Sequence, residues 1–331
     1  MPSMPPKLAT TAPAVPTPHL TDSAPTAALV ELRRAGPAIR VQVWMAMLGS
    51  LAVLTVLMHR AQLAIDPWQA GNRPFYAAGL LALIARFVLP RTRWRHALPL
   101  AHFSEYAAIF TMISLMGATA SYPVAALTSG YADARLHAID VAMGFDWVSL
   151  YRLVAAHPVL QAVGTVVYRS IYVTPAVLLW CAARGGRHDE AYRFIAGFWL
   201  ATVLTLLLFS LMPAIGPFSY LWHSAIPYMP ESEQWQEGLI PALRAYQVHI
   251  VDLGHLRGIV SAPSFHTAAA VLYIAAGWRI PALRWWIVGL NAGMLLSTPV
   301  EGTHYLVDMV FGAGVAGVAL SLMACHRRLT V

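Results

Sequence analysis

Long runs of apolar residues, separated by short polar stretches, dominate this chain from residue 41 onward. Because a helix needs about 20 mostly apolar residues to cross a membrane, we expect about eight crossing helices. Their approximate positions are 41–59, 75–90, 98–128, 159–182, 191–213, 263–280, 284–300 and 304–325. The second is short and contains Arg86, and the third is long enough that we expect it to break near Tyr122 and Pro123. The pattern predicts an all-α fold, a polytopic membrane helical bundle.

Three segments lack the pattern of a crossing helix. Residues 1–36 are rich in Pro, Ala and Thr, which predicts a disordered cytoplasmic tail. In 131–158, apolar and charged residues alternate at helical spacing, which predicts an interfacial helix or helix pair. The loop 214–258 contains Trp and Tyr residues and an acidic patch. Structureless loops of that length are uncommon unless functional, so we expect it to cover a substrate as an extracytoplasmic cap.

Composition and charge support a membrane protein. Residues are 58% hydrophobic and 11% charged, whereas about a quarter are charged in soluble proteins. The net charge of +7 comes without a basic run interleaved with aromatics, so no nucleic-acid partner is expected. With eight crossings both termini lie on one side, which collects fourteen Lys and Arg residues against six. The positive-inside rule then predicts cytoplasmic termini, in an inner or plasma membrane, and no cleavable signal peptide is expected.

Two histidines and a carboxylate lie at helix ends that this topology places on the extracytoplasmic side. His304 and Asp308 are four residues apart, so on a helix they share one face and can touch. A carboxylate on one imidazole nitrogen fixes the tautomer and raises the basicity of the other nitrogen. Such a histidine can attack phosphorus and form a phosphohistidine. A structural His–Asp hydrogen bond would explain the pair alone equally well.

The segment that contains Pro263, Ser264 and His266 predicts a helix start. Proline suits the first turn, where its missing N–H costs nothing. The free N–H groups of that turn and the Ser264 hydroxyl could bind an anion, and His266 could protonate a leaving oxygen. A simple helix cap is the competing explanation. Only one helical hairpin separates this segment from His304, so both are expected on the same face.

With these motifs the chain resembles the type 2 phosphatidic acid phosphatase superfamily. The second motif of that family, Pro-Ser-Gly-His, is similar to Pro263, Ser264, Phe265 and His266. The third, Ser-Arg-x5-His-x3-Asp, is similar to the segment with Ser297, His304 and Asp308. The resemblance covers 98–325 and implies a six-helix catalytic core within 98–331, with 37–97 as two accessory helices. It also implies metal-independent, cofactor-free phosphotransfer, with His304 as nucleophile, Asp308 as its partner and His266 as general acid.

The chain departs from the family at the positions that normally clamp phosphate. Thr298 stands in place of the third-motif arginine. The first motif, Lys-x6-Arg-Pro, would lie after residue 211, where the chain has Met-Pro-Ala-Ile-Gly-Pro-Phe instead. A similar loss is seen in the inositol phosphorylceramide synthase-like branch, which this chain resembles more closely than a phosphatidate phosphatase. That resemblance implies transfer of a phospho-alcohol headgroup between lipids.

Another cation is then expected to neutralise the phosphate. Arg257 is the first candidate, although it could equally be a rim arginine at the headgroup level. Arg169, within a predicted crossing, is the second, with a structural ion pair to Glu105 or Glu301 as the simpler explanation. Arg244 is a weaker candidate. Glu301 could pair with an arginine or orient an acceptor hydroxyl.

The function we expect is that of an integral-membrane lipid phosphatase or phosphotransferase. The expected partners are a lipid phosphate and the bilayer, and no obligate protein partner is inferred. The alternative is a non-enzymatic transporter or proton-relay bundle that uses the same residues, although no inverted repeat supports it. A zinc site built from His266, His304 and Asp308 would require sensitivity to chelators. The sequence does not discriminate among phosphatidate-like lipids, polyprenyl diphosphates and inositol phospholipid donors.

Overall fold

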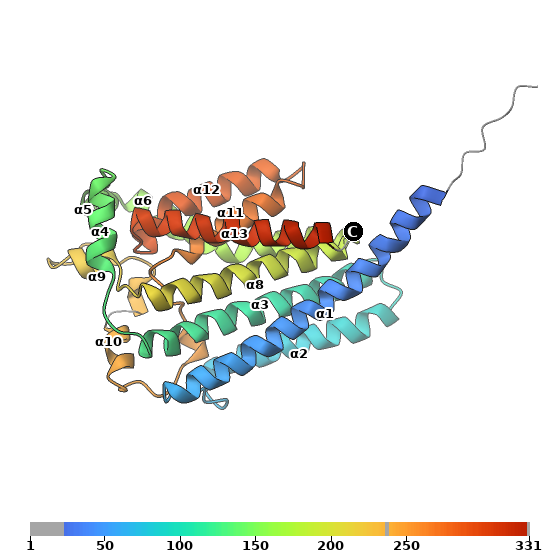
Figure 1. The fold of residues 1–331 in the computed structure, drawn as a ribbon, viewed down its shortest axis with the longest axis horizontal. Coiled ribbons are helices and arrows are strands. Elements are labelled where there is room, and N and C mark those ends of the chain that lie inside the picture. The colour runs from blue at the N-terminus through green and yellow to red at the C-terminus, as the bar shows by residue number, and fades with distance from the viewer. Residues whose placement is uncertain (1–22, 236–237, 330–331) are drawn as a thin grey trace, which may run out of the picture.

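The computed structural model describes residues 23–235 and 238–329. Within these ranges the chain is a helical bundle without strands, which confirms the all-α prediction. In Figure 1 the long helices run roughly along one axis, and short helices gather at the end away from the C-terminus. The long helices are α1 (Ser23–Arg60), α2 (Arg73–Val88), α3 (Ala97–Ala126), α8 (His188–Leu211) and α13 (Leu306–Leu329). The short ones are α4 (Asp133–Ala142), α5 (Trp147–Ala155), α9 (Pro217–Leu221) and α10 (Leu239–Arg244).

In the described part of the chain, six helical segments are long and apolar enough to cross a membrane. They are Ile39–Arg60, Ala70–Arg91, Ala97–Ala126, Pro158–Arg184, His188–Leu211 and Leu306–His326. Two further helices, α11 (Phe265–Gly277) and α12 (Arg284–Glu301), are shorter, with 13 and 18 residues. The protein therefore has the helices of an integral membrane protein, while the count of eight crossings stays a prediction.

The first and third helices differ from their expected extents. We expected α3 to break near Tyr122 and Pro123, but it continues without interruption to Ala126. Pro123 lies in the last turn of α3, and the Leu127 N–H still bonds to the Pro123 carbonyl at 3.0 Å. The disordered tail expected over 1–36 overlaps α1, which begins at Ser23 in a segment that contains Ala, Leu and Arg, all good helix formers. The rest of that tail, 1–22, lies outside the described residues.

The crossing at 158–184 consists of two helices that pack on different partners. α6 (Pro158–Arg169) ends in a 3₁₀ turn, Ser170–Tyr172, and α7 (Val173–Arg184) follows. α6 packs along α12, whereas α7 packs against α3. Glu301, at the end of α12, lies against the middle of α6, where the Thr165 hydroxyl donates to its carboxylate at 3.4 Å. The segment 131–158, for which an interfacial helix or helix pair was predicted, contains the two helices α4 and α5, and Asp146 caps α5 by accepting the Ser149 N–H at 3.1 Å.

A buried carboxylate joins the first three helices. Glu105 on α3 is paired with Arg40 of α1 and Arg86 of α2, each at 2.7 Å, and accepts the Tyr192 hydroxyl at 2.6 Å. The charged residue that made the second crossing doubtful is therefore neutralised inside the bundle. Glu105 is not the partner of Arg169, which was one of the two expected pairings.

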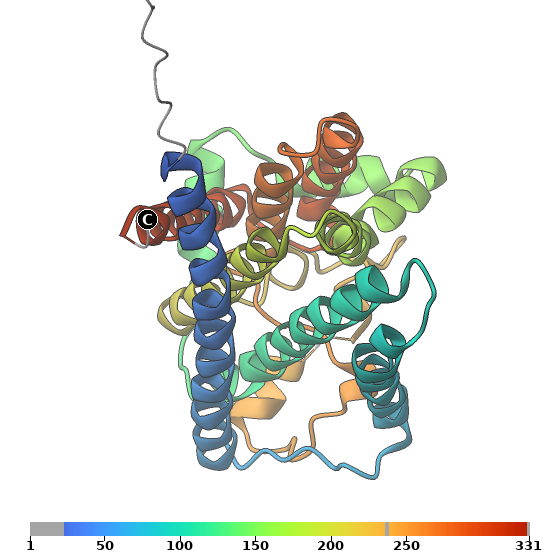
Figure 2. The same ribbon diagram turned by 90° about the vertical axis from the view of Figure 1, so that its right-hand side faces the viewer.

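Small residues let α11 lie very close to α13. Ala268, Ala269 and Ala270 have no exposed surface. A Cβ added at Gly312 would lie 2.2 Å from the Ser264 carbonyl oxygen, so only glycine permits this approach. The contact brings the N-terminal ends of α11 and α13 together. Figure 2 shows the bundle end-on, with the loop after α10 beside the α1–α2 connection. There the Ala64 N–H donates to the His249 carbonyl at 2.8 Å.

Candidate active site

His266 and His304 lie at the N-terminal ends of α11 and α13, which the backbone ties together. The Ser264 N–H donates to the Asp308 carbonyl at 3.0 Å. Pro263 lies just before the helix rather than in its first turn, because Ser264 is the N-cap residue. The Ser264 hydroxyl accepts the Thr267 N–H at 3.4 Å and the Thr267 hydroxyl at 3.2 Å, and the residue is fully buried. Its hydroxyl therefore caps the helix, which leaves the first-turn N–H groups as candidates for an anion.

A backbone carbonyl sets the tautomer of His304. Its Nδ1 lies 2.7 Å from the Ser261 carbonyl oxygen and 3.4 Å from Asp308 Oδ2. A carbonyl oxygen can only accept, so Nδ1 carries the proton. In the neutral ring Nε2 then holds the lone pair, as a nucleophile requires. His304 is 3% exposed, so this arrangement is held inside the protein.

Asp308 touches His304, as the sequence predicted, but it is the more distant of the two acceptors. Its Oδ2 also accepts the Tyr305 N–H at 3.2 Å, which fixes the carboxylate at the start of α13. Its Oδ1 is buried and has no hydrogen-bond partner among the described residues. A carboxylate in this position can stabilise positive charge on the His304 ring without setting its tautomer.

Tyr168 orients His266, and the sequence analysis missed it. The Tyr168 hydroxyl lies 3.2 Å from His266 Nδ1, and the two rings stack with centroids 4.0 Å apart. When His266 is charged, or neutral with its proton on Nδ1, Nδ1–H donates to the hydroxyl oxygen; when the neutral ring has its proton on Nε2, the hydroxyl donates to Nδ1. In each of these states Nδ1 is occupied and Nε2 is left for chemistry. The sequence signal for this role was a tyrosine directly before Arg169 in an apolar run.

Gly302 lies where the His304 ring and the Tyr168 hydroxyl come close together. A Cβ added there would lie 2.7 Å from His304 Cδ2, 2.8 Å from the Thr298 carbonyl oxygen and 3.0 Å from the Tyr168 hydroxyl. Cδ2 is bonded to Nε2, so the reactive edge of His304 borders the same small volume as Tyr168. Since Tyr168 also contacts His266, both imidazoles belong to one site.

Two buried aspartates on α4, which sequence reasoning also missed, accept backbone N–H groups at the start of α13 and in the segment after α8. Asp140 accepts the N–H groups of Leu306 and Val307 at 2.8 and 2.9 Å, and so caps α13 from another helix. Asp133 accepts the N–H groups of Ile215 and Gly216, each at 3.0 Å. Burial raises the pKa of both carboxyl groups, and these N–H donors oppose the rise. The only sequence signal was their i, i+7 spacing on one helix.

Glu301 ends α12 and is buried beneath part of the long loop. It accepts the Tyr228 hydroxyl on both oxygens, at 2.7 and 2.9 Å, and the Glu231 N–H at 3.3 Å. Next to it, the Thr303 hydroxyl donates to Glu233 at 2.8 Å. The segment 228–233 therefore lies directly against the residues that precede His304. This end of the site is acidic.

Two of the three arginines proposed to clamp phosphate, Arg169 and Arg244, are engaged elsewhere. Arg169 makes a bidentate ion pair with Glu231, at 2.9 and 2.8 Å, and its side chain is 59% exposed rather than inside the bundle. Arg257 donates to the Leu256 carbonyl at 3.3 Å and has no ion pair among the described residues. Arg244 donates to the Ala125 carbonyl at 3.2 Å and stacks over Tyr131, so it joins α10 to α3.

The remaining predicted residue, Ser297, lies within α12 and not at its end. Its hydroxyl donates to the Met294 carbonyl at 2.9 Å. Thr298, at the position of the family arginine, is fully buried and donates to the same carbonyl at 2.7 Å. Over the described residues, no group of His, Cys, Asp and Glu has an arrangement that could hold a metal ion.

Comparison with known proteins gives one match. The family model of the PAP2 superfamily matches residues 134–322. No curated protein and no solved structure matches the chain. The matched range contains His266, His304, Asp308 and Asp140 of α4. The expected resemblance is confirmed at the level of the superfamily.

Proposed function

We propose that this chain, which belongs to the PAP2 superfamily, is an integral-membrane lipid phosphoesterase that works through a phosphohistidine on His304. One observation carries the proposal: both histidines have Nδ1 occupied by a fixed partner, so both present Nε2. Two imidazoles of this kind around one small volume suit a nucleophile and an acid–base group on opposite sides of a phosphorus atom.

The proposed first step transfers the phosphoryl centre to the protein. The Nε2 lone pair of His304 forms a bond to phosphorus while the phosphorus–oxygen bond to the leaving alcohol breaks. The imidazolium form of His266 gives its Nε2 proton to the departing oxygen, while Tyr168 accepts the Nδ1–H. The carboxylate of Asp308 and the Ser261 carbonyl stabilise the charge on the phosphorylated ring.

The second step regenerates the protein. His266, now neutral, has a lone pair on Nε2 and takes a proton from water or an alcohol. The oxygen of that acceptor forms a bond to phosphorus, and the bond to His304 Nε2 breaks. The reaction is hydrolysis when water is the acceptor, and headgroup transfer when it is a lipid alcohol.

We further propose that the substrate is a phosphodiester and that the headgroup is transferred, as in the inositol phosphorylceramide synthase-like branch. A phosphomonoester carries up to two negative charges and a diester only one, so a diester needs fewer cations. Here Thr298 replaces an arginine, Arg169 is neutralised by Glu231, and Glu301 and Glu233 lie beside His304. These carboxylates would repel a dianion, and they can accept hydrogen bonds from a polyol headgroup or an acceptor alcohol.

The experiment is a turnover assay of purified protein against lipid phosphomonoesters and phosphodiesters, with and without alcohol acceptors. We expect diester turnover that increases with an alcohol acceptor and yields a new diester, and no turnover by His304→Ala protein of unchanged thermal stability. Retained turnover in that variant would reject the nucleophile. Fast release of inorganic phosphate from a monoester, with no diester turnover, would reject the proposed headgroup transfer. The proposed phosphoesterase activity would stand.

Glu301→Gln tests the acidic end of the site separately. The variant keeps the hydrogen bond from Tyr228 and removes one negative charge, so we expect monoester turnover to rise relative to diester turnover. Glu190→Gln is the matched control, since Glu190 pairs with Arg187 at the other end of the bundle. An unchanged ratio in Glu301→Gln would contradict the charge argument.

We also propose that 98–331 is the catalytic core, that 37–97 is accessory, and that the site faces away from the cytoplasm. The lysine and arginine asymmetry supports this orientation. Single cysteines placed at Ser224 and near the C-terminus of a Cys-free variant should react with an impermeant thiol reagent from opposite sides of intact cells. Labelling of both from the same side would contradict the topology.

A further inference from the structure

A cavity of about 750 Å³ lies at the end of the bundle opposite the histidines. Its walls come from α7, α8, α11 and α13, and many are apolar, such as Leu178, Leu272 and Met323. A second, apolar cavity of about 240 Å³ lies between α1, α8 and α13 and shares Met323 with the first. Together they offer apolar space on both sides of one methionine.

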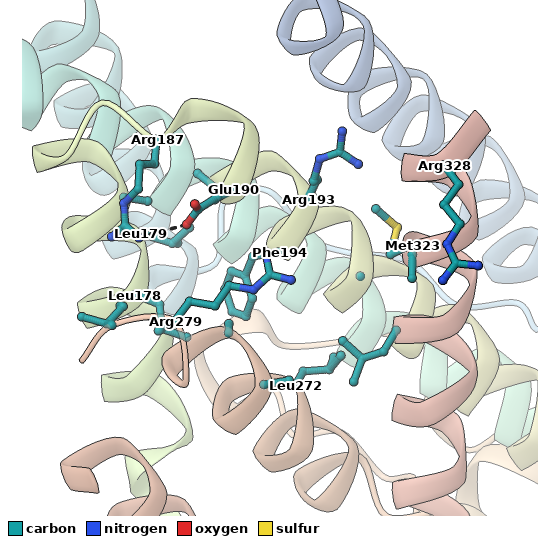
Figure 3. Close-up of a pocket in the computed structure, with 18 residues that line it drawn as sticks. Leu178, Leu179, Arg187, Glu190, Arg193, Phe194, Leu272, Arg279, Met323 and Arg328 are labelled. Carbon is teal, nitrogen blue, oxygen red and sulfur yellow. Dashed lines mark hydrogen bonds and ion pairs between the residues drawn. The ribbon is translucent and has the colours of Figure 1, made fainter. Parts of the chain in front are cut away.

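Four arginines line the larger cavity: Arg187, Arg193, Arg279 and Arg328. Glu190 is the one acidic residue of the lining, and it is already paired with Arg187 at 3.0 Å. Arg193, Arg279 and Arg328 form no ion pair among the described residues, and Arg193 Nη1 is buried without a hydrogen-bond partner. Figure 3 shows these three side chains coming from different segments around the cavity. A buried guanidinium nitrogen without a partner calls for an anionic ligand.

This cavity is distinct from the proposed reaction site. Arg279 follows His266 by 13 residues along α11 and its end, which corresponds to about 20 Å at 1.5 Å per residue. Under the predicted topology, the arginines lie at the level of the cytoplasmic headgroups. An apolar cavity with cations at that level matches a molecule with an anionic head and an apolar tail.

We propose that this cavity binds an anionic phospholipid of the cytoplasmic leaflet, with the phosphate among Arg193, Arg279 and Arg328 and acyl carbons against Leu272 and Met323. Guanidinium groups bind phosphate oxygens in a planar, two-point geometry, which favours arginine over lysine here. A water-soluble phosphate compound would leave the leucine and alanine walls in contact with water. The charge excess selects anionic over zwitterionic lipids.

The test is native mass spectrometry of purified protein titrated with phosphatidylglycerol or phosphatidylcholine of the same acyl chains. We expect tighter binding of phosphatidylglycerol and a loss of at least about tenfold in that preference in the Arg193→Ala/Arg279→Ala variant. Arg91→Ala/Arg184→Ala is the matched control, since both arginines lie at the same end but outside the cavity lining. It should keep the preference.

Two further measurements keep the proposal falsifiable. Ala275→Phe fills the cavity without changing charge and should weaken binding of both lipids. In wild-type protein the preference should fall as salt is raised, because salt screens the phosphate–arginine attraction, and this needs no variant to fold. Equal binding of the two lipids, an unchanged preference in the double variant, or equal loss in its control would overturn the proposal. His304→Ala protein should bind like wild type, so this result is separate from the fate of the proposed reaction.

Discussion

Tyr168→Phe removes one hydroxyl and keeps the ring that stacks on His266. The substitution removes the 3.2 Å hydrogen bond to His266 Nδ1. The aromatic ring, which is common to Tyr and Phe, can still stack on His266 with a centroid distance of 4.0 Å. The His266 imidazole then keeps its position but loses the hydrogen-bond partner of its Nδ1 atom. The structure therefore predicts a change in His266 chemistry with little change in packing.

The magnitude follows from the kind of hydrogen bond. A hydrogen bond between neutral groups contributes about 0.5–1.5 kcal/mol, and one to a charged group about 1.5–3 kcal/mol. If His266 is an imidazolium when it acts as acid, the charged value applies, which corresponds to a decrease of roughly 10- to 150-fold in kcat. The substrate does not touch the lost hydroxyl in the proposed reaction, so KM should change little.

The assay compares kcat, KM and thermal midpoint across pH for wild type, Tyr168→Phe and Tyr172→Phe. Tyr172 is 73% exposed and lies four residues further along, so it is the matched control. We expect a lower kcat and a displaced acid limb of the pH profile only in Tyr168→Phe. Wild-type kcat in that variant, or a loss of kcat that is matched by a loss of thermal stability, would refute the role given to the hydroxyl.

Three further predictions follow from the same geometry. Asp308→Asn should lower kcat by about 10- to 100-fold and not abolish it, because the Ser261 carbonyl still fixes the His304 tautomer; a loss as complete as that of His304→Ala would contradict this. Gly302→Ala should lower kcat by at least about 100-fold, because its Cβ would displace His304, whereas Gly289→Ala, which has open space at its Cβ, should not. Incubation with EDTA should leave turnover unchanged, and a chelator-sensitive rate restored by zinc would contradict the metal-independent scheme.

The sequence was most informative where the length of apolar runs and the residues that start a helix decide the structure. The apolar runs located all of the long helices, and Pro263 with Ser264 marked the start of α11 to within two residues. His304 and Asp308 do touch, at 3.4 Å, although His304 lies two residues before the start of α13. These features depend on neighbours in the chain, which a single sequence displays directly.

The supporting residues could not be found in the same way. Tyr168 reaches His266 across 98 positions of sequence, and Asp140 reaches Leu306 across 166. The Ser261 carbonyl carries no side-chain signature at all. Arg169 was expected inside the bundle because it lies in an apolar run, but the 3₁₀ turn after α6 places it at an exposed edge beside Glu231.

The most direct test of the account is detection of the covalent intermediate. Purified protein mixed with a substrate identified in the turnover assay would be quenched in alkali, which preserves phosphohistidine, then digested and analysed by mass spectrometry. The account predicts a phosphoryl or phospho-headgroup adduct on His304 that forms as fast as turnover and is absent from His304→Ala protein. Turnover without any adduct on His304, or an adduct on another residue, would contradict it.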